Sequence, residues 1–286
     1  MTYRIRELTL SEFPSLLSEI PEPPKKLFSA GNFENKENKL LCVVGSRKYT
    51  EYGKAVTESI IKDLTGYPIS IVSGLALGID SIAHRAAIRH KLHTIAVPGS
   101  GLGLDALYPR SHVRLAEDIV ASGGLLLSEF ENDFRATPWS FPQRNRIMAG
   151  MSHATLVIEA DIRSGTLITA RLATDYNRDV FTVPGSIFST TSAGPHMLIR
   201  LGSTPITSGK DILTAFGIEE KMTKEQNYTN LSEEEIKIIS LLHEPMERDE
   251  LIRKSEMSAH IINSILTVME IKGLVIERMG MIEKKK

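Results

Sequence analysis

The fold is decided by the stretch Leu40-Leu41-Cys42-Val43-Val44-Gly45-Ser46-Arg47, in which five apolar residues run directly into a glycine, a serine and an arginine. Strands buried on both faces of a parallel sheet read as continuous apolar runs of this kind. Open parallel sheets bind ligands beyond the carboxyl ends of their strands. We therefore predict a buried parallel strand that delivers the Gly-Ser-Arg cluster to a ligand site.

Five further apolar runs end in small or charged polar residues: Ile69–Val72, His93–Val97, Gly124–Leu127, Leu156–Ile158 and Val180–Val183. Helical spacing is found between most of the runs and in a closing segment, at Tyr52–Gly66, Ile79–Lys91, His112–Ser122, Arg144–Met151, Leu167–Tyr176 and Asp211–Phe216. This alternation predicts an α/β domain with a mostly parallel sheet and helices on both faces. Glycine and serine at the strand ends indicate that the site holds an anion.

The sheet domain is expected to span residues 40–218, after a lead-in over residues 1–39. The lead-in has weak helical spacing at Leu10–Ile20, which Pro21 ends. Residues 219–230 are polar and are typical of a linker.

Residues 231–286 show a different pattern. Three short helices are expected first and a strand and turn after them, at Ser232–Leu242, Arg248–Lys254, Ser258–Lys272, Gly273–Arg278 and Met279-Gly280. This order predicts a small winged-helix domain, with a frayed tail at Glu283–Lys286. The third helix carries only His260 and Lys272 as basic or potentially basic residues, whereas helices that read a DNA groove normally carry several polar side chains. We therefore interpret this domain as a protein-contact module rather than a duplex reader.

Composition places the chain among ordinary proteins of the cytoplasm. Apolar residues make up 42% and charged residues 24%, and the formal net charge is −1. No apolar run is long enough to insert into a membrane, and the first thirty residues lack the apolar stretch of a signal peptide. The single cysteine, Cys42, cannot form a disulfide within one chain. The charge excludes a grossly basic nucleic-acid binder but allows a local basic site.

Three of the strand-end clusters suit phosphate chemistry. In Gly45-Ser46-Arg47 the glycine lets the backbone approach a phosphate, the serine can donate a hydrogen bond and the arginine offers a bidentate fork. Ser73-Gly74 could form an anion nest at the next helix start. Ser164-Gly165 could hold anion oxygens or could merely cap a helix. A Walker A loop is rejected, because Gly53-Lys54 is followed by alanine.

The densest cluster is Trp139-Ser140-Phe141-Pro142-Gln143-Arg144-Asn145-Arg146. Two arginines flank an asparagine at an expected helix start, where the helix dipole already favours anions. A ring at Trp139 or Phe141 offers a face on which a nucleobase can stack. Surface arginines beside a core aromatic are the alternative, but the convergence of these residue types favours single-strand recognition.

Metal, cofactor and catalytic signals are weak. Asp80 and His84 lie four residues apart on one helix, but no third ligand stands at a recognisable spacing, so we expect no metal. The dinucleotide fingerprint G-x-G-x-x-G is absent, and we expect no cofactor. Glu129 and Glu159 follow two strands and could act as acid and base, although carboxylates there more often fix loops.

Taken in order, these motifs resemble the DNA processing protein A (DprA/Smf) family. The matching stretches are Val43–Arg47, Ile71–Asp80 with Ala83-His84, Phe141–Gly150, Val157–Ala160 leading to Ser164–Ala170, and Val180–Gly185 with Gly194-Pro195 and Leu198-Ile199. The match covers about residues 20–218 and continues into the winged-helix tail. Five ordered motifs are far more specific than any one of them.

The resemblance implies an extended Rossmann-like domain that binds single-stranded DNA, forms a homodimer, and delivers incoming strands to the RecA recombinase in natural transformation. It implies a non-enzymatic protein, with a DNA pocket formed by Gly45, Ser46, Arg47, Ser73, Gly74, Gln143, Arg144, Asn145, Arg146, Ser164 and Gly165, beside the stacking ring of Phe141. The sequence departs from the family pattern at Leu77, where arginine is frequent, and at His112, where asparagine is usual. The lead-in is also shorter than the helical domain that many members carry before the sheet.

Two other functions stay open at this point. One is a nucleotide-processing enzyme of the related phosphoribohydrolase-like Rossmann group, although its Pro-Gly-Gly-x-Gly-Thr signature is only echoed at Pro98-Gly99-Ser100-Gly101 and Pro184-Gly185-Ser186. The other is an adaptor whose main partner is a protein and whose pocket is vestigial.

Overall fold

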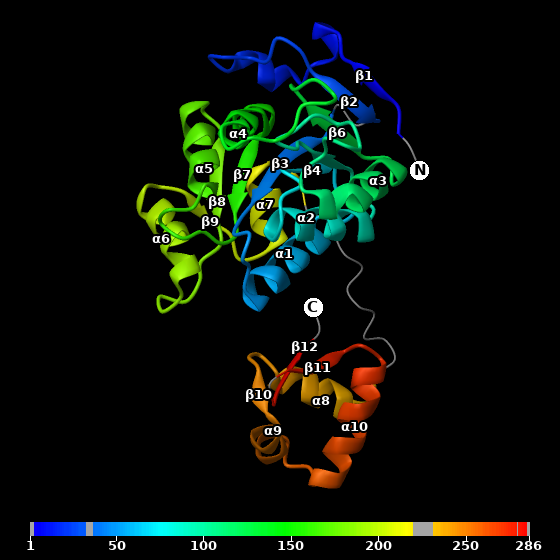
Figure 1. Ribbon diagram of the computed structural model, residues 1–286. Helices are drawn as coiled ribbons and strands as arrows, with labels where there is room; N and C mark the ends of the chain where they lie inside the picture. Colours follow the sequence, from blue (N-terminus) through cyan, green and yellow to red (C-terminus); the bar gives the residue numbers. More distant parts are fainter. Residues whose placement is uncertain (1–2, 33–36, 220–230, 279, 285–286) are drawn as a thin grey trace. The chain divides into compact units, whose positions relative to one another are not determined.

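The computed structural model describes residues 3–32, 37–219, 231–278 and 280–284. The chain forms two compact units, Met1–Glu220 and Lys221–Lys286, and Figure 1 shows the elements of each. The expected linker at residues 219–230 lies almost wholly outside the described residues. No helix in the described part of the chain is both long enough and apolar enough to cross a membrane.

The first unit is built on a sheet that has nine strands within the described residues, in the order β1-β2-β6-β5-β4-β3-β7-β8-β9. The strands are β1 (Ile5–Glu7), β2 (Phe28–Gly31), β3 (Lys39–Val44), β4 (Ile69–Ser73), β5 (Thr94–Ala96), β6 (Leu125–Ser128), β7 (Ala154–Val157), β8 (Asp179–Thr182) and β9 (Thr204–Pro205). The pairs β1–β2 and β2–β6 are antiparallel, and all other pairs are parallel. The expected mostly parallel sheet is confirmed.

Two strands of this sheet come from residues 1–39. β2 pairs with β6, and β1 pairs with β2, so both extend one edge of the sheet. The folded unit therefore begins before the expected boundary at residue 40. The weak helix expected at Leu10–Ile20 is instead two 3₁₀ turns, η1 (Leu10–Glu12) and η2 (Ser15–Glu19).

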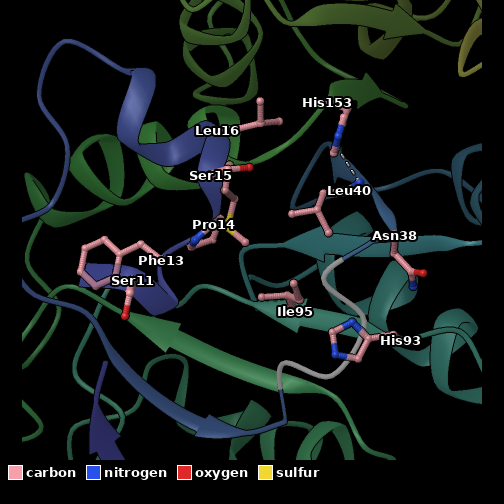
Figure 2. Close-up of a pocket in the computed structure, with 11 residues that line it drawn as sticks. Ser11, Phe13, Pro14, Ser15, Leu16, Asn38, Leu40, His93, Ile95 and His153 are labelled. Carbon is pink, nitrogen blue, oxygen red and sulfur yellow. Dashed lines mark hydrogen bonds between the residues drawn. The ribbon is translucent and has the colours of Figure 1, made fainter. Parts of the chain in front are cut away.

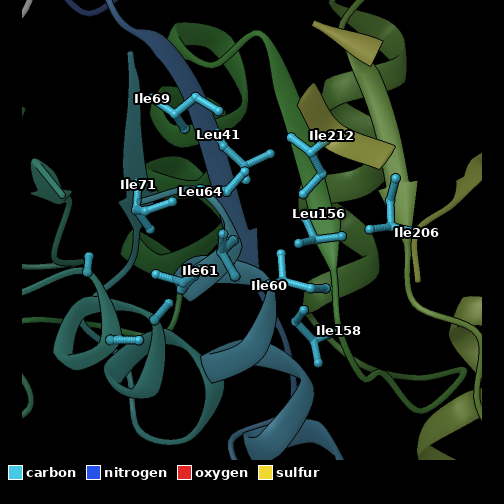
Figure 3. Close-up of a cluster of buried hydrophobic side chains, with 14 of the residues drawn as sticks. Leu41, Ile60, Ile61, Leu64, Ile69, Ile71, Leu156, Ile158, Ile206 and Ile212 are labelled. Atoms are coloured by element: carbon cyan, nitrogen blue, oxygen red, sulfur yellow. The ribbon is translucent and has the colours of Figure 1, made fainter. Parts of the chain in front are cut away.

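Helices cover both faces of the sheet, as expected. Side chains alternate along β3, so that Leu41 and Val43 face one core while Cys42 and Val44 face the other. The first core includes residues of α1 (Glu51–Asp63), α2 (Ile79–Arg89) and α7 (Gly209–Ala215), and Figure 3 shows its isoleucines and leucines between strands and helices. The second includes residues of α4 (Ser140–Met151), α5 (Thr166–Asp175) and α6 (Ala193–Arg200). A third core lies under α3 (Val113–Ala121), beside β2 and β6.

The second unit has the winged-helix arrangement that the sequence predicts. Its elements are α8 (Glu233–Leu241), β10 (Met246–Glu247), α9 (Arg248–Ser255), α10 (Ala259–Ile271), β11 (Val275–Arg278) and β12 (Met281–Lys284). The strands pair in the order β10-β12-β11 and cover a separate apolar core. The expected frayed tail needs a correction, because Glu283 and Lys284 belong to β12.

Candidate functional site

The candidate site lies where the strand order of the sheet reverses. From β3 the order runs through β4, β5 and β6 on one side and through β7, β8 and β9 on the other, so β3 and β7 flank the topological switch point. Ligands of open α/β sheets bind in the crevice outside the carboxyl ends of the strands at this point. A cleft of ≈ 660 Å³ opens there, lined among others by Gly45, Ser46, Arg47, Lys48, Phe141, Arg144, Asn145, Arg163, Ser164, Gly165, Thr166, Ile168 and Thr191.

The loop after β3 presents two exposed cations to this cleft. The Ser46 hydroxyl donates to the Lys48 carbonyl (2.7 Å) and accepts from the Lys48 amide (3.0 Å), which folds the loop into a tight turn. The Arg47 guanidinium carbon lies 5.3 Å from the centre of the Phe141 ring, a cation–π distance. No described carboxylate forms a salt bridge with Arg47 or Lys48. Both cations are therefore available to an anionic ligand.

The opposite wall is the first turn of α5. Gly165 is its N-cap and is exposed, and the space beside its Cα is open. The Thr166 hydroxyl donates to the Gly45 carbonyl (3.1 Å), which ties this wall to the loop after β3. The Ser164 hydroxyl accepts from the amide of Thr166, the first residue of the helix (3.2 Å), and Arg163 beside it is exposed. The helix start and Arg163 thus add positive potential to the cleft.

Arg144 is placed differently from Arg47. It is only 4% exposed, and its Nη1 donates to the carbonyls of Gly74 and Val97 at the ends of β4 and β5. A Cβ at residue 74 would collide with the Arg144 guanidinium, which would have to move from the two carbonyls. Because the guanidinium is buried against backbone carbonyls, Arg144 acts mainly as a clamp on the cleft wall.

Asp80 completes the clamp from the first turn of α2. Its Oδ2 accepts from the Gly74 amide (3.1 Å). Burial raises the pKa of Asp80, and the nearby charge of Arg144 opposes that rise. Burial also lowers the pKa of Arg144, and Asp80 opposes that shift in turn. The two buried charges therefore stabilise each other beneath the cleft.

Arg146 and Gln143 face away from the cleft and do not line it. Arg146 forms a salt bridge with Glu129 and donates to the Glu22 carbonyl. The Gln143 side chain also hydrogen bonds to Glu129. Asn145 does line the cleft, and its Oδ1 accepts from Nε of Arg144 (3.0 Å). The Arg-Asn-Arg cluster is therefore split between two sides of α4.

The cluster after β4 lies behind the cleft rather than in it. The Ser73 hydroxyl is fully buried and donates to the Val43 carbonyl (2.7 Å). Gly74 gives its amide to Asp80 and its carbonyl to Arg144, so neither group is left to form an anion nest. Both residues position the neighbouring strand ends.

The carboxylates considered for catalysis are bound to loops. Glu159 accepts from the backbone amide and the hydroxyl of Thr50 and from the hydroxyl of Thr191, and so fixes the start of α1. A side chain at residue 53 would collide with it, which explains the glycine there. Of the pair considered for a metal, Asp80 Oδ2 accepts from the Gly74 amide (3.1 Å) and Nδ1 of His84 contacts the hydroxyl of Thr94 (2.8 Å). Within the described residues no group of three potential metal ligands occurs.

A second hollow, of ≈ 260 Å³, opens near the amino ends of the strands, and Figure 2 shows its lining. His153 accepts from the Leu40 amide there (3.0 Å), and burial lowers the pKa of His153. None of the lining residues is an aspartate, glutamate, lysine or arginine. This hollow is therefore no candidate for phosphate. The cleft at the carboxyl ends, which the exposed Arg47, Lys48 and Arg163 line, is the candidate anion site.

Sequence reasoning missed part of the cleft. Lys48, Arg163 and Ile168 line it but were not singled out. The signal for the first two was present, since each lies beside a motif that was selected. Trp139, in contrast, packs against Phe130 and Phe134, so Phe141 is the ring that faces the cleft.

Fold and site together define a Rossmann-like protein with a cationic, partly aromatic cleft at its switch point and a separate winged-helix unit. The chain matches the family described as DNA recombination-mediator protein A over residues 5–217, and the DprA winged helix domain over residues 222–281. The chain belongs to this family, DprA/Smf.

Several relatives show how far the similarity extends. Protein Smf of Escherichia coli is 42% identical over 204 residues, which are 71% of this chain and 54% of that protein, so the chain spans about half of its length. DNA processing protein DprA of Streptococcus pneumoniae is 43% identical over 204 residues, 71% of each chain. The crystal structure of the S. pneumoniae protein matches with a TM-score of 0.69, at 40% identity over 76% of each chain.

A structure of DNA processing protein A from Helicobacter pylori, described in terms of its single-stranded DNA binding mode, matches with a TM-score of 0.67. The identity is 29%, over 75% of this chain and 96% of that one. The extended Rossmann-like fold is thereby shown.

Proposed function

We propose that this protein binds single-stranded DNA in the cleft between β3 and α5, largely without regard to sequence. The observation that carries the proposal is the set of exposed cations, Arg47, Lys48 and Arg163, around the half-buried Phe141 ring. Cations that follow a phosphate backbone, combined with an aromatic face for bases, are the features that single-strand binders share. The single-stranded DNA binding mode described for the H. pylori relative supports this assignment.

The chemistry is divided between the two walls of the cleft. Arg47 and Lys48 on one side and Arg163 with the start of α5 on the other would neutralise phosphates. The walls also carry small residues, which would let the DNA backbone approach closely: Gly45, Ser46, Ser164 and Gly165. Asn145 would donate its side-chain amide. Five other residues of the expected site would hold the walls in place without contacting DNA: Ser73, Gly74, Gln143, Arg144 and Arg146.

We further propose that the protein acts without catalysis and serves DNA processing in natural transformation, as a cytoplasmic homodimer that loads the RecA recombinase onto the bound strand. The membership in the DprA/Smf family supports this role. The engagement of Glu129 with Arg146 and of Glu159 with Thr50 favours binding over nucleotide hydrolysis. The winged-helix unit would contact protein, because Ile261, Val268 and Ile271 are exposed on α10.

The test is a titration of the full chain into labelled oligothymidylate and into a matching duplex at several salt concentrations. Each neutralised phosphate contributes ~0.7 to the log–log salt slope for single strands, so three cations predict a slope near ~2. Arg47→Ala should weaken binding and lower the slope by ~0.7. Arg114→Ala is the matched control, since this exposed arginine lies on α3, outside the cleft. Absence of single-strand binding at low salt would refute the proposal.

A further inference from the structure

Three large apolar side chains on the loops that follow β7 and β8 are exposed, and we call them the apolar rim: Ile162, Ile187 and Phe188. Their exposed fractions are 61%, 79% and 91%. Where large apolar side chains at this exposure form one contiguous patch, they usually mark a binding surface. Nothing in the cleft chemistry described so far uses them.

The rim stands on two loops that hydrogen bond to each other. Ile162 lies in the loop after β7, while Ile187 and Phe188 lie in the loop after β8, the neighbouring strand. The Ala160 amide donates to the Thr191 carbonyl (2.8 Å), and the Gly194 amide donates to the Ala160 carbonyl (2.9 Å). Both loops therefore lie at the carboxyl ends of the strands, where the cleft also lies.

The loop that carries Phe188 is anchored. The Ser189 amide donates to the Ser186 carbonyl (3.0 Å), and the Phe188 amide donates to the Ser186 hydroxyl (3.3 Å). Ser189 then contacts the hydroxyl of Thr191 (2.9 Å), which binds Glu159. The hydrogen bonds of Ser186 and Ser189 thus hold the turn that carries Phe188, while the Phe188 ring itself is 91% exposed.

The two loops that carry the rim also contribute residues to the cationic cleft. Arg163 lines the cleft and directly follows Ile162 in the chain. Ile168 and Thr191 also line the cleft, and Thr191 is three residues from Phe188. Ile162 therefore adjoins a cleft cation in the chain, and on the opposite wall Arg47 lies over the ring of Phe141.

We propose that the apolar rim binds the bases of the single strand whose phosphates occupy the cleft, with Phe188 as the stacking ring. The inference rests on the proposed function and extends it, because it assigns bases to the β8 side of the cleft in addition to Phe141. Stacking on a ring tolerates every base, which agrees with binding that ignores sequence. Ile162 and Ile187 would flank the stacked base.

The experiment compares two labelled strands of equal length and charge, oligothymidylate and an oligomer of abasic sites. Phe188→Ala should weaken binding to oligothymidylate by roughly tenfold, since stacking of one base is worth about that much. It should leave affinity for the abasic strand unchanged, because the phosphate contacts remain. Leu10→Ala is the control, as Leu10 is a large apolar side chain of the first unit that is 74% exposed and does not line the cleft.

Arg47→Ala separates the two hypotheses, because it should weaken binding to both strands. If Arg47→Ala weakens binding and Phe188→Ala leaves oligothymidylate affinity intact, the rim assignment is overturned and the cleft stands. If Phe188→Ala lowers affinity for both strands equally and changes the sedimentation mass, the rim is a protein contact and the assignment again fails. If the unchanged protein binds neither strand, both the assignment of phosphates to the cleft and the assignment of bases to the rim are refuted.

Discussion

Arg144→Met tests whether the buried guanidinium is a clamp. The substitution keeps an unbranched side chain but removes the charge that faces Asp80 and the donors to the carbonyls of Gly74 and Val97. Removing one partner of a buried charge pair typically costs about 3–5 kcal/mol, because the other charge is left uncompensated. At roughly 2–4 °C per kcal/mol for a domain of this size, the melting temperature should fall by about 6–20 °C.

The assay can follow the first unit alone. Trp139 is the only tryptophan of the chain and packs against Phe130 and Phe134, so its fluorescence reports unfolding of that unit in urea. Asp80→Asn combined with Arg144→Met should cost less than the sum of the two single changes, since the double variant leaves no charge unpaired. Arg114→Met, on the exposed surface of α3, should cost below about 1 kcal/mol.

The loss of stability caused by Arg144→Met should depend on pH in a defined direction. Burial raises the folded-state pKa of Asp80 above its unfolded value, so Asp80 contributes stability that falls as pH rises through that interval. Loss of Arg144 raises the pKa further and widens the interval. The destabilisation by Arg144→Met should therefore be smallest in acid and grow with pH. A cost below about 0.5 kcal/mol, or strict additivity with Asp80→Asn, would refute the clamp.

Three further predictions follow from other parts of the molecule. Thr50→Ala removes the hydroxyl that caps α1 and binds Glu159, and urea titration should show a loss of about 1–2 kcal/mol; an unchanged midpoint would contradict the anchoring role. Burial raises the pKa of Cys42 to about 12, so its thiolate is scarce at neutral pH, and labelling by a thiol reagent should follow unfolding rather than native-state exposure. The fragment 231–286 has its own core and should fold by circular dichroism without binding duplex DNA; duplex binding by that fragment would overturn the protein-contact assignment.

The parallel sheet was predictable because each central strand can be recognised from its own residues, without knowledge of its partner strands. Each central strand is buried on both faces and therefore reads as a mostly apolar run, interrupted only by small hydroxyl residues such as Ser70 in β4 and Thr155 in β7. β1 and β2 lack this signal: β1 is mostly exposed, and β2 is four residues long and includes a glycine. β2 pairs with β6, about a hundred residues away, and β1 pairs with β2, so no local pattern encodes the place of either strand in the sheet.

α6 was missed for a related reason. Its sequence Ala193-Gly194-Pro195 reads as a helix breaker. Proline is tolerated in the first turn of a helix, because its missing amide would have no partner there. The Gly194 position is fixed by close packing, since a Cβ would lie 2.6 Å from the Ala160 carbonyl oxygen. Gly194 and Pro195, which are unfavourable inside a helix, therefore allow this helix to start against the loop after β7.

The arginines show why the site was only partly predictable. Arg47, Arg144 and Arg146 have the same chemistry, and each stands beside a motif that suits phosphate. What separates them is whether a partner elsewhere in the chain has already taken the charge: Glu129 for Arg146, the ends of β4 and β5 with Asp80 for Arg144, and no described carboxylate for Arg47. Those partners come from strand ends that the topology brings together. A sequence can therefore indicate which cations are candidates for binding an anion, but the fold determines which of them lack a partner within the protein.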